Sequence, residues 1–200
     1  MRRKYGRSYT SFKNQMPQIL ICSIFIMGVV IGSLFSNTLD SSIDSGAFET
    51  SQLVNGFIVN INLNGLSNSY LLGRSILTYG KQVALIWLFG LFPATIPLIG
   101  LLVGVQGFSY GFTTSFFVME YNLNGVLLCL AAYGIQGTLF VIVMFLLSIE
   151  AFRFAKKDMA VSPKMYLLYL LVAIGAVIMI ALYESYIAPV IIQEIITTFF

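Results

Sequence analysis

Few residues in this chain have the types and spacing that acid–base, nucleophilic or metal chemistry requires. The sequence has no His and only two Cys. A His-bearing zinc site, a Ser-His-Asp triad and a Cys-His pair all need an imidazole, so these sites are excluded. Asp40, Asp44 and Asp158 fall in segments expected to be loops, whereas an intramembrane aspartyl protease needs two Asp within helices. We therefore expect no enzymatic activity, no cofactor and no metal.

The cysteines and the basic residues also have simple interpretations. Cys22 and Cys129 lie inside apolar runs, where thiols usually pack as small hydrophobic groups. The sequence contains no GxxxxGK[ST] motif that would hold nucleotide phosphates. The five basic residues among the first 13 positions are explained by membrane orientation and anionic lipid, so no nucleic-acid partner is expected.

Strongly polar side chains within or at the end of apolar runs include Gln106, Gln136, Glu150 and Glu184. Polar groups at membrane depth are costly, and they indicate helix contacts or function. We predict Gln136 about midway along a span, where its amide would either hydrogen-bond to another helix or belong to a solute path. Glu184 is predicted to be an interfacial carboxylate at the end of the last span.

The elements that must position these residues are membrane helices. Hydrophobic residues make up 58% of the chain, charged residues 10%, and mean hydropathy is +0.89, against about 25% charged residues in a typical soluble domain. A bilayer core of about 30 Å needs roughly 20 apolar residues per helix. We therefore predict an all-α integral membrane protein with five transmembrane helices, at 17–37, 82–98, 100–119, 124–150 and 165–184.

The second and third spans are predicted to come from one uncharged run over 82–119. As a single helix it would be near 57 Å long, too long for one crossing. Pro93 and Pro97 interrupt the run, and glycines follow them. We predict a helix break between Pro93 and Gly104, so that the two spans form a hairpin.

The distribution of basic residues predicts the orientation. Five lie in the basic segment 1–16 and four in the loop 151–164, which leaves only Arg74 and Lys81 elsewhere. Basic loops stay in the cytoplasm. With five spans both basic segments are cytoplasmic, so we predict an N-in, C-out protein with 38–81 and the C-terminal segment 185–200 outside the cell membrane.

The segment 38–81 is the longest stretch outside the predicted spans. Leu53, Phe57 and Ile61 recur at helical spacing among polar residues, and Tyr70 belongs to a second apolar pattern. We predict amphipathic helices that either cap the bundle at the membrane surface or form the surface that meets extracytoplasmic partner proteins. The two interpretations are compatible.

Glycine spacing indicates close helix packing. The pairs Gly28/Gly32, Gly100/Gly104 and Gly107/Gly111 each place two glycines one helical turn apart, which lets helix backbones approach closely. Such pairs within five predicted spans favour a compact bundle, and one pair could serve a homo-oligomer interface.

The order of features resembles the stage II sporulation protein M family. The resemblance rests on the basic start, on MGVVIGS at 27–33, on LIWLFG at 85–90 before the proline and glycine break, on GFSYGFTT at 107–114 and on ESYIAPV at 184–190. The pattern departs from the family around 134–138, where a proline would be expected. The resemblance covers nearly the whole chain.

The resemblance implies a role in engulfment of the forespore, in the septal and engulfing mother-cell membrane. Family members are thought to act with stage II sporulation proteins D and P, which are cell-wall hydrolases. The chain would then be a non-catalytic scaffold that recruits or anchors these enzymes. The alternative is a small permease-like subunit that moves a solute or lipid, perhaps beside an ATPase, because helices broken at Pro93 and Pro97 near Gln106 would suit a half-helix binding site.

Overall fold

A computed structural model describes residues 2–42, 68–130, 134–156, 162–191 and 194. Within them the long helices are α1 (Arg2–Ser42), α3 (Asn68–Phe89), α4 (Ile96–Cys129), α5 (Ile135–Ala155) and α6 (Pro163–Leu182). The 3₁₀ turn η2 (Pro93–Thr95) precedes α4, and the π-helical turn η4 (Tyr183–Ile187) follows α6. The predicted all-helical fold is confirmed, since the described part of the chain contains no strand.

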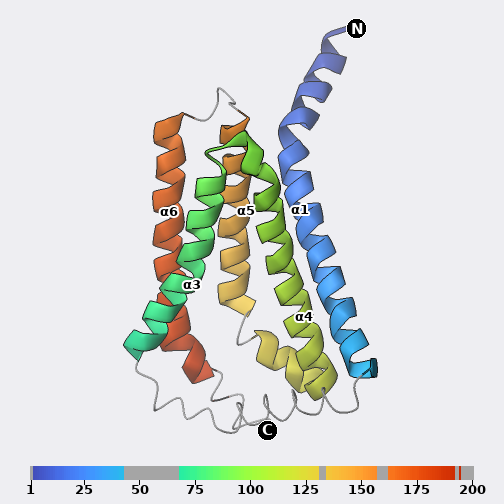
Figure 1. The fold of residues 1–200 in the computed structure, drawn as a ribbon, viewed down its shortest axis with the longest axis vertical. Helices are drawn as coiled ribbons and strands as arrows, with labels where there is room; N and C mark the ends of the chain where they lie inside the picture. Colours follow the sequence, from blue (N-terminus) through green and yellow to red (C-terminus); the bar gives the residue numbers. More distant parts are fainter. Residues whose placement is uncertain (1, 43–67, 131–133, 157–161, 192–193, 195–200) are drawn as a thin grey trace.

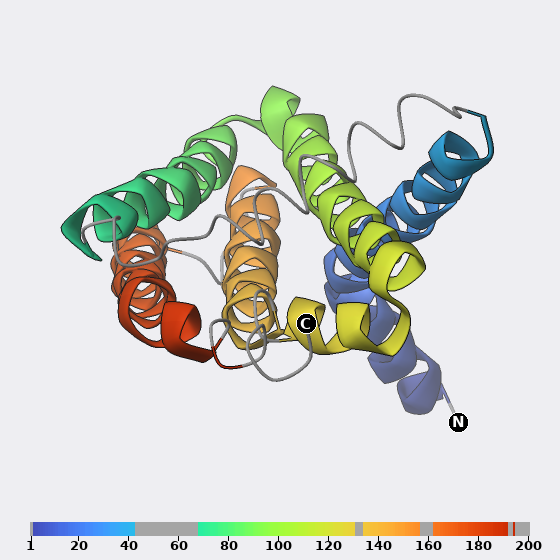
Figure 2. The same cartoon turned by 90° about the horizontal axis from the view of Figure 1, so that it is seen from below.

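The helices alternate in direction along one bundle axis (Figure 1). The start of α1, the turn between α3 and α4, the end of α5 and the start of α6 lie at one end, which we call the N-terminal end. The end of α1, the start of α3 and the end of α6 lie at the opposite end. Seen along the axis, α5 separates the pair α3 and α6 from the pair α1 and α4 (Figure 2).

Four helical segments of the described chain are long and apolar enough to cross a membrane: Met16–Thr38, Pro93–Leu127, Ile135–Ala155 and Pro163–Ile191. Their lipid-facing surface is apolar, as exposed Leu171, Val172 and Met179 on α6 illustrate. Helices that are hydrophobic all round are typical of a membrane environment. The apolar helices therefore indicate an integral membrane protein. Helix α3 is not among the four, and it carries Arg74 and Lys81.

The bundle core lies where α5 and α6 meet α3. Phe140, Met144 and Leu147 of α5 are at most 2% exposed, as are Val83 and Ile86 of α3. Their spacing of three or four residues keeps each set on one face of its helix. Although α3 carries Arg74 and Lys81, this face makes it an integral part of the bundle.

The break between α3 and α4 occurs earlier than the sequence indicated. Helix α3 ends at Phe89, and α4 begins at Ile96, so the helix expected over 82–98 in fact covers Asn68–Phe89. Thr95 Oγ1 donates a hydrogen bond to the Phe92 carbonyl oxygen at 2.8 Å within the turn. Pro97 lies in the first turn of α4, where the missing amide hydrogen costs nothing. The glycines from 100 to 111 consequently belong to a continuous helix.

The chain reverses sharply at Asn122 in the C-terminal part of α4. Asn122 has φ 51° and ψ −127°, outside the helical region. An ideal Cβ on Gly125 would lie 2.6 Å from the Phe117 carbonyl carbon, so the chain after Asn122 folds back against the helix before it. The reversal lies between the spans predicted over 100–119 and 124–150. The helix predicted over 124–150 is shared between two elements, because 123–129 belongs to the returning segment at the end of α4 and α5 begins only at Ile135.

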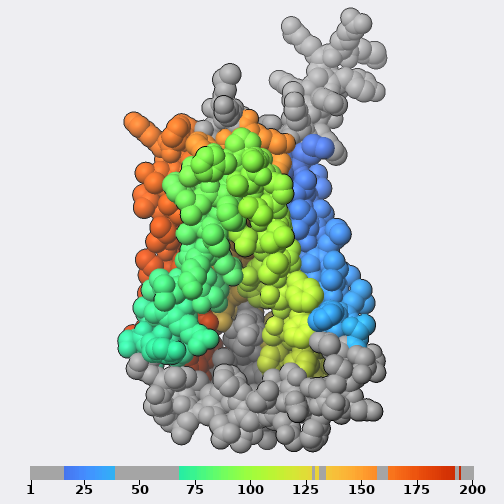
Figure 3. Space-filling view, in the orientation of Figure 1, coloured from blue at the N-terminus to red at the C-terminus, as the bar shows by residue number. Residues whose placement is uncertain are grey.

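The described residues of the segment 38–81, for which we predicted a loop and amphipathic helices, are helical. Helix α1 continues to Ser42, and residues 68–81 form the first part of α3. Ser75 is buried, and Tyr70 is 57% exposed. Leu53, Phe57 and Ile61 lie outside the described residues. On the face shown in Figure 3, α3 and α4 meet near the turn between them and diverge towards the opposite end.

Candidate functional site

Helices α1 and α4 are in direct backbone contact along a seam formed by four glycines. An ideal Cβ on Gly28 would overlap the carbonyl oxygen of Gly104, and one on Gly32 would lie 2.9 Å from the Phe108 carbonyl carbon. From the other helix, Cβ atoms on Gly107 and Gly111 would overlap the carbonyl oxygens of Phe25 and Val29, respectively. No larger residue fits these four positions unless the helices separate, as expected for small residues at a membrane-helix contact.

The remaining predicted pair, Gly100 and Gly104, has different neighbours. A Cβ on Gly100 would meet only the Ile24 Cδ1 atom at 3.2 Å, and one on Gly104 only Ile24 Cγ2 at 3.4 Å. Both glycines instead line an apolar groove between α1 and α4. A side chain added at Gly28, Gly32, Gly107 or Gly111 would therefore meet the backbone of the facing helix, whereas one added at Gly100 or Gly104 would meet only the Ile24 side chain beside the groove.

Stacked phenylalanine rings on α4 extend the contact between α1 and α4 beyond Gly107. The ring centroids of Phe108 and Phe112 are 6.1 Å apart, and those of Phe112 and Phe116 are 6.4 Å apart. Phe35 of α1 lies against this row, 5.8 Å from Phe108. The sequence analysis missed these residues, although the i, i+4 spacing of the three phenylalanines in α4 predicts a shared helix face.

The predicted intramembrane polar residues lie on three separate elements. Gln106 is partly exposed on α4. Gln136 is 3% exposed, but it is the second residue of α5 rather than a residue midway along a span. The Tyr110 hydroxyl donates a hydrogen bond to the Gly137 carbonyl oxygen at 3.4 Å, so the start of α5 is held against α4.

Glu184 lies in the π-helical turn that extends α6. Its Oε2 atom is buried without a hydrogen-bond partner among the described residues. The next residue, Ser185, is 1% exposed, and its hydroxyl donates to the Ala181 carbonyl oxygen at 2.7 Å. The turn packs against α3. Such π-helical turns are rare and recur at functional sites, and this one carries the only acidic residue between Pro163 and Ile191.

An aromatic cluster fixes the turn between α3 and α4 to the start of α6. The Tyr166 hydroxyl donates a hydrogen bond to the Trp87 carbonyl oxygen at 2.7 Å. The Tyr166 ring stacks on Phe154 with 4.3 Å between centroids. A Cβ on Gly90 would overlap the Tyr166 hydroxyl. The sequence analysis did not single out Tyr166, because its partners are distant along the chain.

The described residues contain no group of three His, Cys, Asp or Glu side chains placed to hold a metal ion. Cys22 is exposed and Cys129 is buried, and neither forms a disulfide. The features that this part of the chain does present are surfaces: a glycine seam, an aromatic row and apolar grooves. These features support association with lipids or with other proteins.

Comparison with known protein families identifies a family to which the chain is similar. The family model described as stage II sporulation protein M matches residues 21–189. Comparison with curated proteins and with solved structures finds no match. The matched residues extend from the apolar part of α1 through the glycine seam to the end of η4, which is most of the chain. The chain therefore belongs to the stage II sporulation protein M family.

Proposed function

We propose that this protein is a non-catalytic membrane scaffold of the engulfment machinery, and that it recruits or anchors cell-wall hydrolases at the septal and engulfing mother-cell membrane. The family match makes it a sporulation-related membrane protein. The partners implied by the sequence resemblance are stage II sporulation proteins D and P. In this proposal the hydrolases supply the chemistry, and the bundle supplies their position.

The proposal includes five membrane spans, with α3 as the second. Helix α3 has 22 residues, and at ~1.5 Å per residue it is about 33 Å long, enough to cross the hydrocarbon core. Buried Val83 and Ile86 pack it into the core. Arg74 and Lys81 are both exposed, and long basic side chains can carry their charge towards the membrane surface.

The distribution of basic residues supports an N-in, C-out orientation. Arg153, Lys156 and Lys164 flank the connection from α5 to α6, and this connection lies at the N-terminal end of the bundle. The basic segment 1–16 precedes the first apolar stretch at the same end. Because basic segments are retained in the cytoplasm, this end would face the cytoplasm.

The observation that carries the proposal is where the connection between α1 and α3 is attached. Ser42 and Asn68 both lie at the end opposite the basic residues. In the proposed orientation, the 25 residues from 43 to 67 therefore begin and end on the outer side of the membrane. Cell-wall hydrolases act on that side, so this connection, with Tyr70 exposed beside it, is our candidate docking surface.

The test replaces residues 44–66 with a Gly/Ser linker of equal length and leaves α1 and α3 intact. We expect the variant to reach the membrane at normal levels but to lose co-purification of the hydrolases from sporulating cells in detergent. Engulfment, followed by microscopy with a membrane dye, should stop. The matched control replaces residues 157–161, the connection at the opposite end, and should retain both properties.

Two results would contradict the proposal. One is a 44–66 variant that still co-purifies with the hydrolases and completes engulfment. The other is a pair of results: the 44–66 variant completes engulfment, and a Gln136→Leu or Gln106→Leu protein that is folded and inserted in the membrane does not. The second result would favour a permease-like subunit, because these changes remove polar groups within the helices and leave the outer connection intact.

A further inference from the structure

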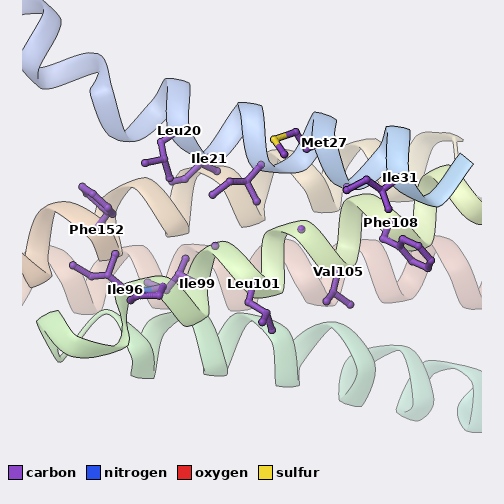
Figure 4. Close-up of a pocket in the computed structure, with 15 residues that line it drawn as sticks. Leu20, Ile21, Met27, Ile31, Ile96, Ile99, Leu101, Val105, Phe108 and Phe152 are labelled. Atoms are coloured by element: carbon purple, nitrogen blue, oxygen red, sulfur yellow. The ribbon is translucent and has the colours of Figure 1, made fainter. Parts of the chain in front are cut away.

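An apolar groove of about 730 Å³ runs between α1 and α4 on the outside of the bundle. Figure 4 shows Leu20, Ile96 and Phe152 at one end, and Ile31 and Phe108 at the other. All fifteen lining residues are apolar. In a membrane, such a groove is filled by lipid or by another helix, because an apolar wall offers water no hydrogen-bond partners.

The length of the groove matches one leaflet of a bilayer. The eleven residue steps from Leu20 to Ile31 cover about 16 Å along α1, at ~1.5 Å per residue. Half of a hydrocarbon core of about 30 Å is roughly 15 Å. A transmembrane helix of a partner would need a groove about twice as long. The groove therefore has the length of a single acyl chain that enters from one membrane surface.

The groove is closed at its inner end. Phe108 lines it there, and the Phe35 ring packs against Phe108 with 5.8 Å between centroids. At this end the backbones of α1 and α4 are in contact beside Phe108, since a Cβ on Gly32 would lie 2.9 Å from the Phe108 carbonyl carbon. A chain lying in the groove would end near the middle of the bundle.

The open end carries a positive charge held against the groove wall. Phe152, which lines this end, lies under the Lys156 ammonium group, whose Nζ is 4.4 Å from the ring centroid. Arg153 is already paired with Glu150 at 2.9 Å. Lys156 is exposed, and its ammonium group is available to a phosphate at the membrane surface. The arrangement matches the two parts of a phospholipid, an apolar chain and an anionic headgroup.

We propose that the α1–α4 groove binds one acyl chain of an anionic phospholipid from the leaflet at the N-terminal end of the bundle, and that Lys156 contacts the phosphate of this lipid.

A second groove, of about 670 Å³, lies between α5 and α6. It is lined by apolar residues and by Tyr183 and Tyr186 near the opposite end, with no basic residue among them. The first groove differs from it in the Lys156 ammonium group that lies over the Phe152 ring of its wall, so the second groove serves as an internal comparison.

The first test counts lipids retained on the full-length protein by native mass spectrometry. The protein is purified in detergent and offered phosphatidylglycerol or phosphatidylcholine with identical chains. We expect one tightly retained phosphatidylglycerol per chain. Gly100→Leu should abolish this retention, because its Cβ meets only the flexible end of Ile24 and the rest of the side chain fills the groove.

Gly175→Leu is the matched control for the groove-filling variant. It adds the same side chain on α6, where an added Cβ meets nothing within 4 Å. The control should retain phosphatidylglycerol like the wild type. Equal retention by Gly100→Leu, or equal retention of phosphatidylcholine by the wild type, would overturn the proposal. A change from dimer to monomer in Gly100→Leu would also overturn it, because the groove would then hold a second copy of the chain.

The second test addresses the headgroup. Lys156→Gln should reduce the preference for phosphatidylglycerol over phosphatidylcholine about fivefold, the effect of one basic residue at an anionic surface. Lys164→Gln removes a basic residue from α6, which does not line the groove, and should leave the preference unchanged. An equal loss in both variants would mean that general surface charge, rather than a Lys156 contact, sets the preference.

A third measurement needs no variant. Phosphatidylglycerol with a diazirine at the middle of one chain is activated by light on the wild-type protein in vesicles, and the modified peptides are sequenced. We expect labels on groove residues such as Met27, Leu101 and Val105, and fewer labels on the α5–α6 groove. The reverse distribution would refute the proposal. None of these assays involves hydrolases, so their failure would leave the proposed scaffold function untouched.

Discussion

Replacing Gly111 with Ala is the sharpest test of how α1 and α4 pack. The added Cβ would lie 2.7 Å from the carbonyl carbon of Val29 and 2.8 Å from its Cα. Carbon atoms in contact prefer about 3.5–4.0 Å, so the helices must separate by roughly 1 Å. The obstructing atoms belong to the backbone and cannot turn aside as a side chain would.

The expected change in the free energy of unfolding is the difference between two opposing contributions. Overpacking a tight contact costs about 1–3 kcal/mol, while Ala in place of a helical Gly recovers about 0.5–1 kcal/mol. We expect Gly111→Ala to be destabilised by about 1–2 kcal/mol, which lowers Tm by about 2–8 °C in a chain of this size. The shift in Tm is measured by thermal unfolding of the purified protein in detergent.

Gly104→Ala, on the same helix, is the control. Its Cβ would meet Ile24 Cγ2 at 3.4 Å, an ordinary van der Waals distance. The Tm should stay the same or rise, because only the favourable helix-propensity term of up to about 1 kcal/mol remains. If both variants melt at the wild-type temperature, or if Gly104→Ala is the less stable one, the described rotation of α1 against α4 is incorrect.

Three further changes test other parts of the structure. Tyr166→Phe removes the hydrogen bond to the Trp87 carbonyl oxygen and should cost about 0.5–1.5 kcal/mol of unfolding free energy, measured by thermal unfolding; an unchanged Tm would mean that this bond does not stabilise the turn. Phe140→Ala empties a fully buried position in the core and should cost about 3–5 kcal/mol, so a folded variant of normal stability would contradict the core assignment. In a chain without its native cysteines, an impermeant thiol reagent added to intact cells should label Ser45→Cys and spare Ala160→Cys, and the reverse pattern would overturn the N-in, C-out orientation.

The sequence was sufficient for the chemical class of the protein. A chain with 58% hydrophobic and 10% charged residues has too few charged side chains to cover the surface of a soluble protein. This composition therefore predicts apolar helices that are long enough to span a membrane. The resemblance to the stage II sporulation protein M family was also visible in the sequence and is confirmed by the family match. These properties depend on residue types and their order, and neither needs a particular packing.

Helix boundaries were only partly predictable, because they depend on local backbone geometry. Two prolines indicated a break between Pro93 and Gly104, but Pro93 begins the 3₁₀ turn η2 whereas Pro97 lies in the first turn of α4. Proline is compatible with both positions, so the sequence could not separate them. The reversal at Asn122 falls in the connection expected between the spans at 100–119 and 124–150. No proline or charged residue between 123 and 135 indicated that the second of these spans is shared between α4 and α5.

Only the tertiary structure decided which residues face one another. Gly28/Gly32, Gly100/Gly104 and Gly107/Gly111 have identical spacing, yet an added Cβ would meet only a side chain at Gly100 and Gly104, and the backbone of the facing helix at the other four. The difference arises from the rotation of each helix about its axis, which is set by the packing of all its neighbours. The same holds for Tyr166 and Trp87, which are 79 residues apart in the chain and joined by a hydrogen bond. Composition determines that a helix lies in the membrane, whereas the rotation that brings its particular side chains together is fixed only when the bundle packs.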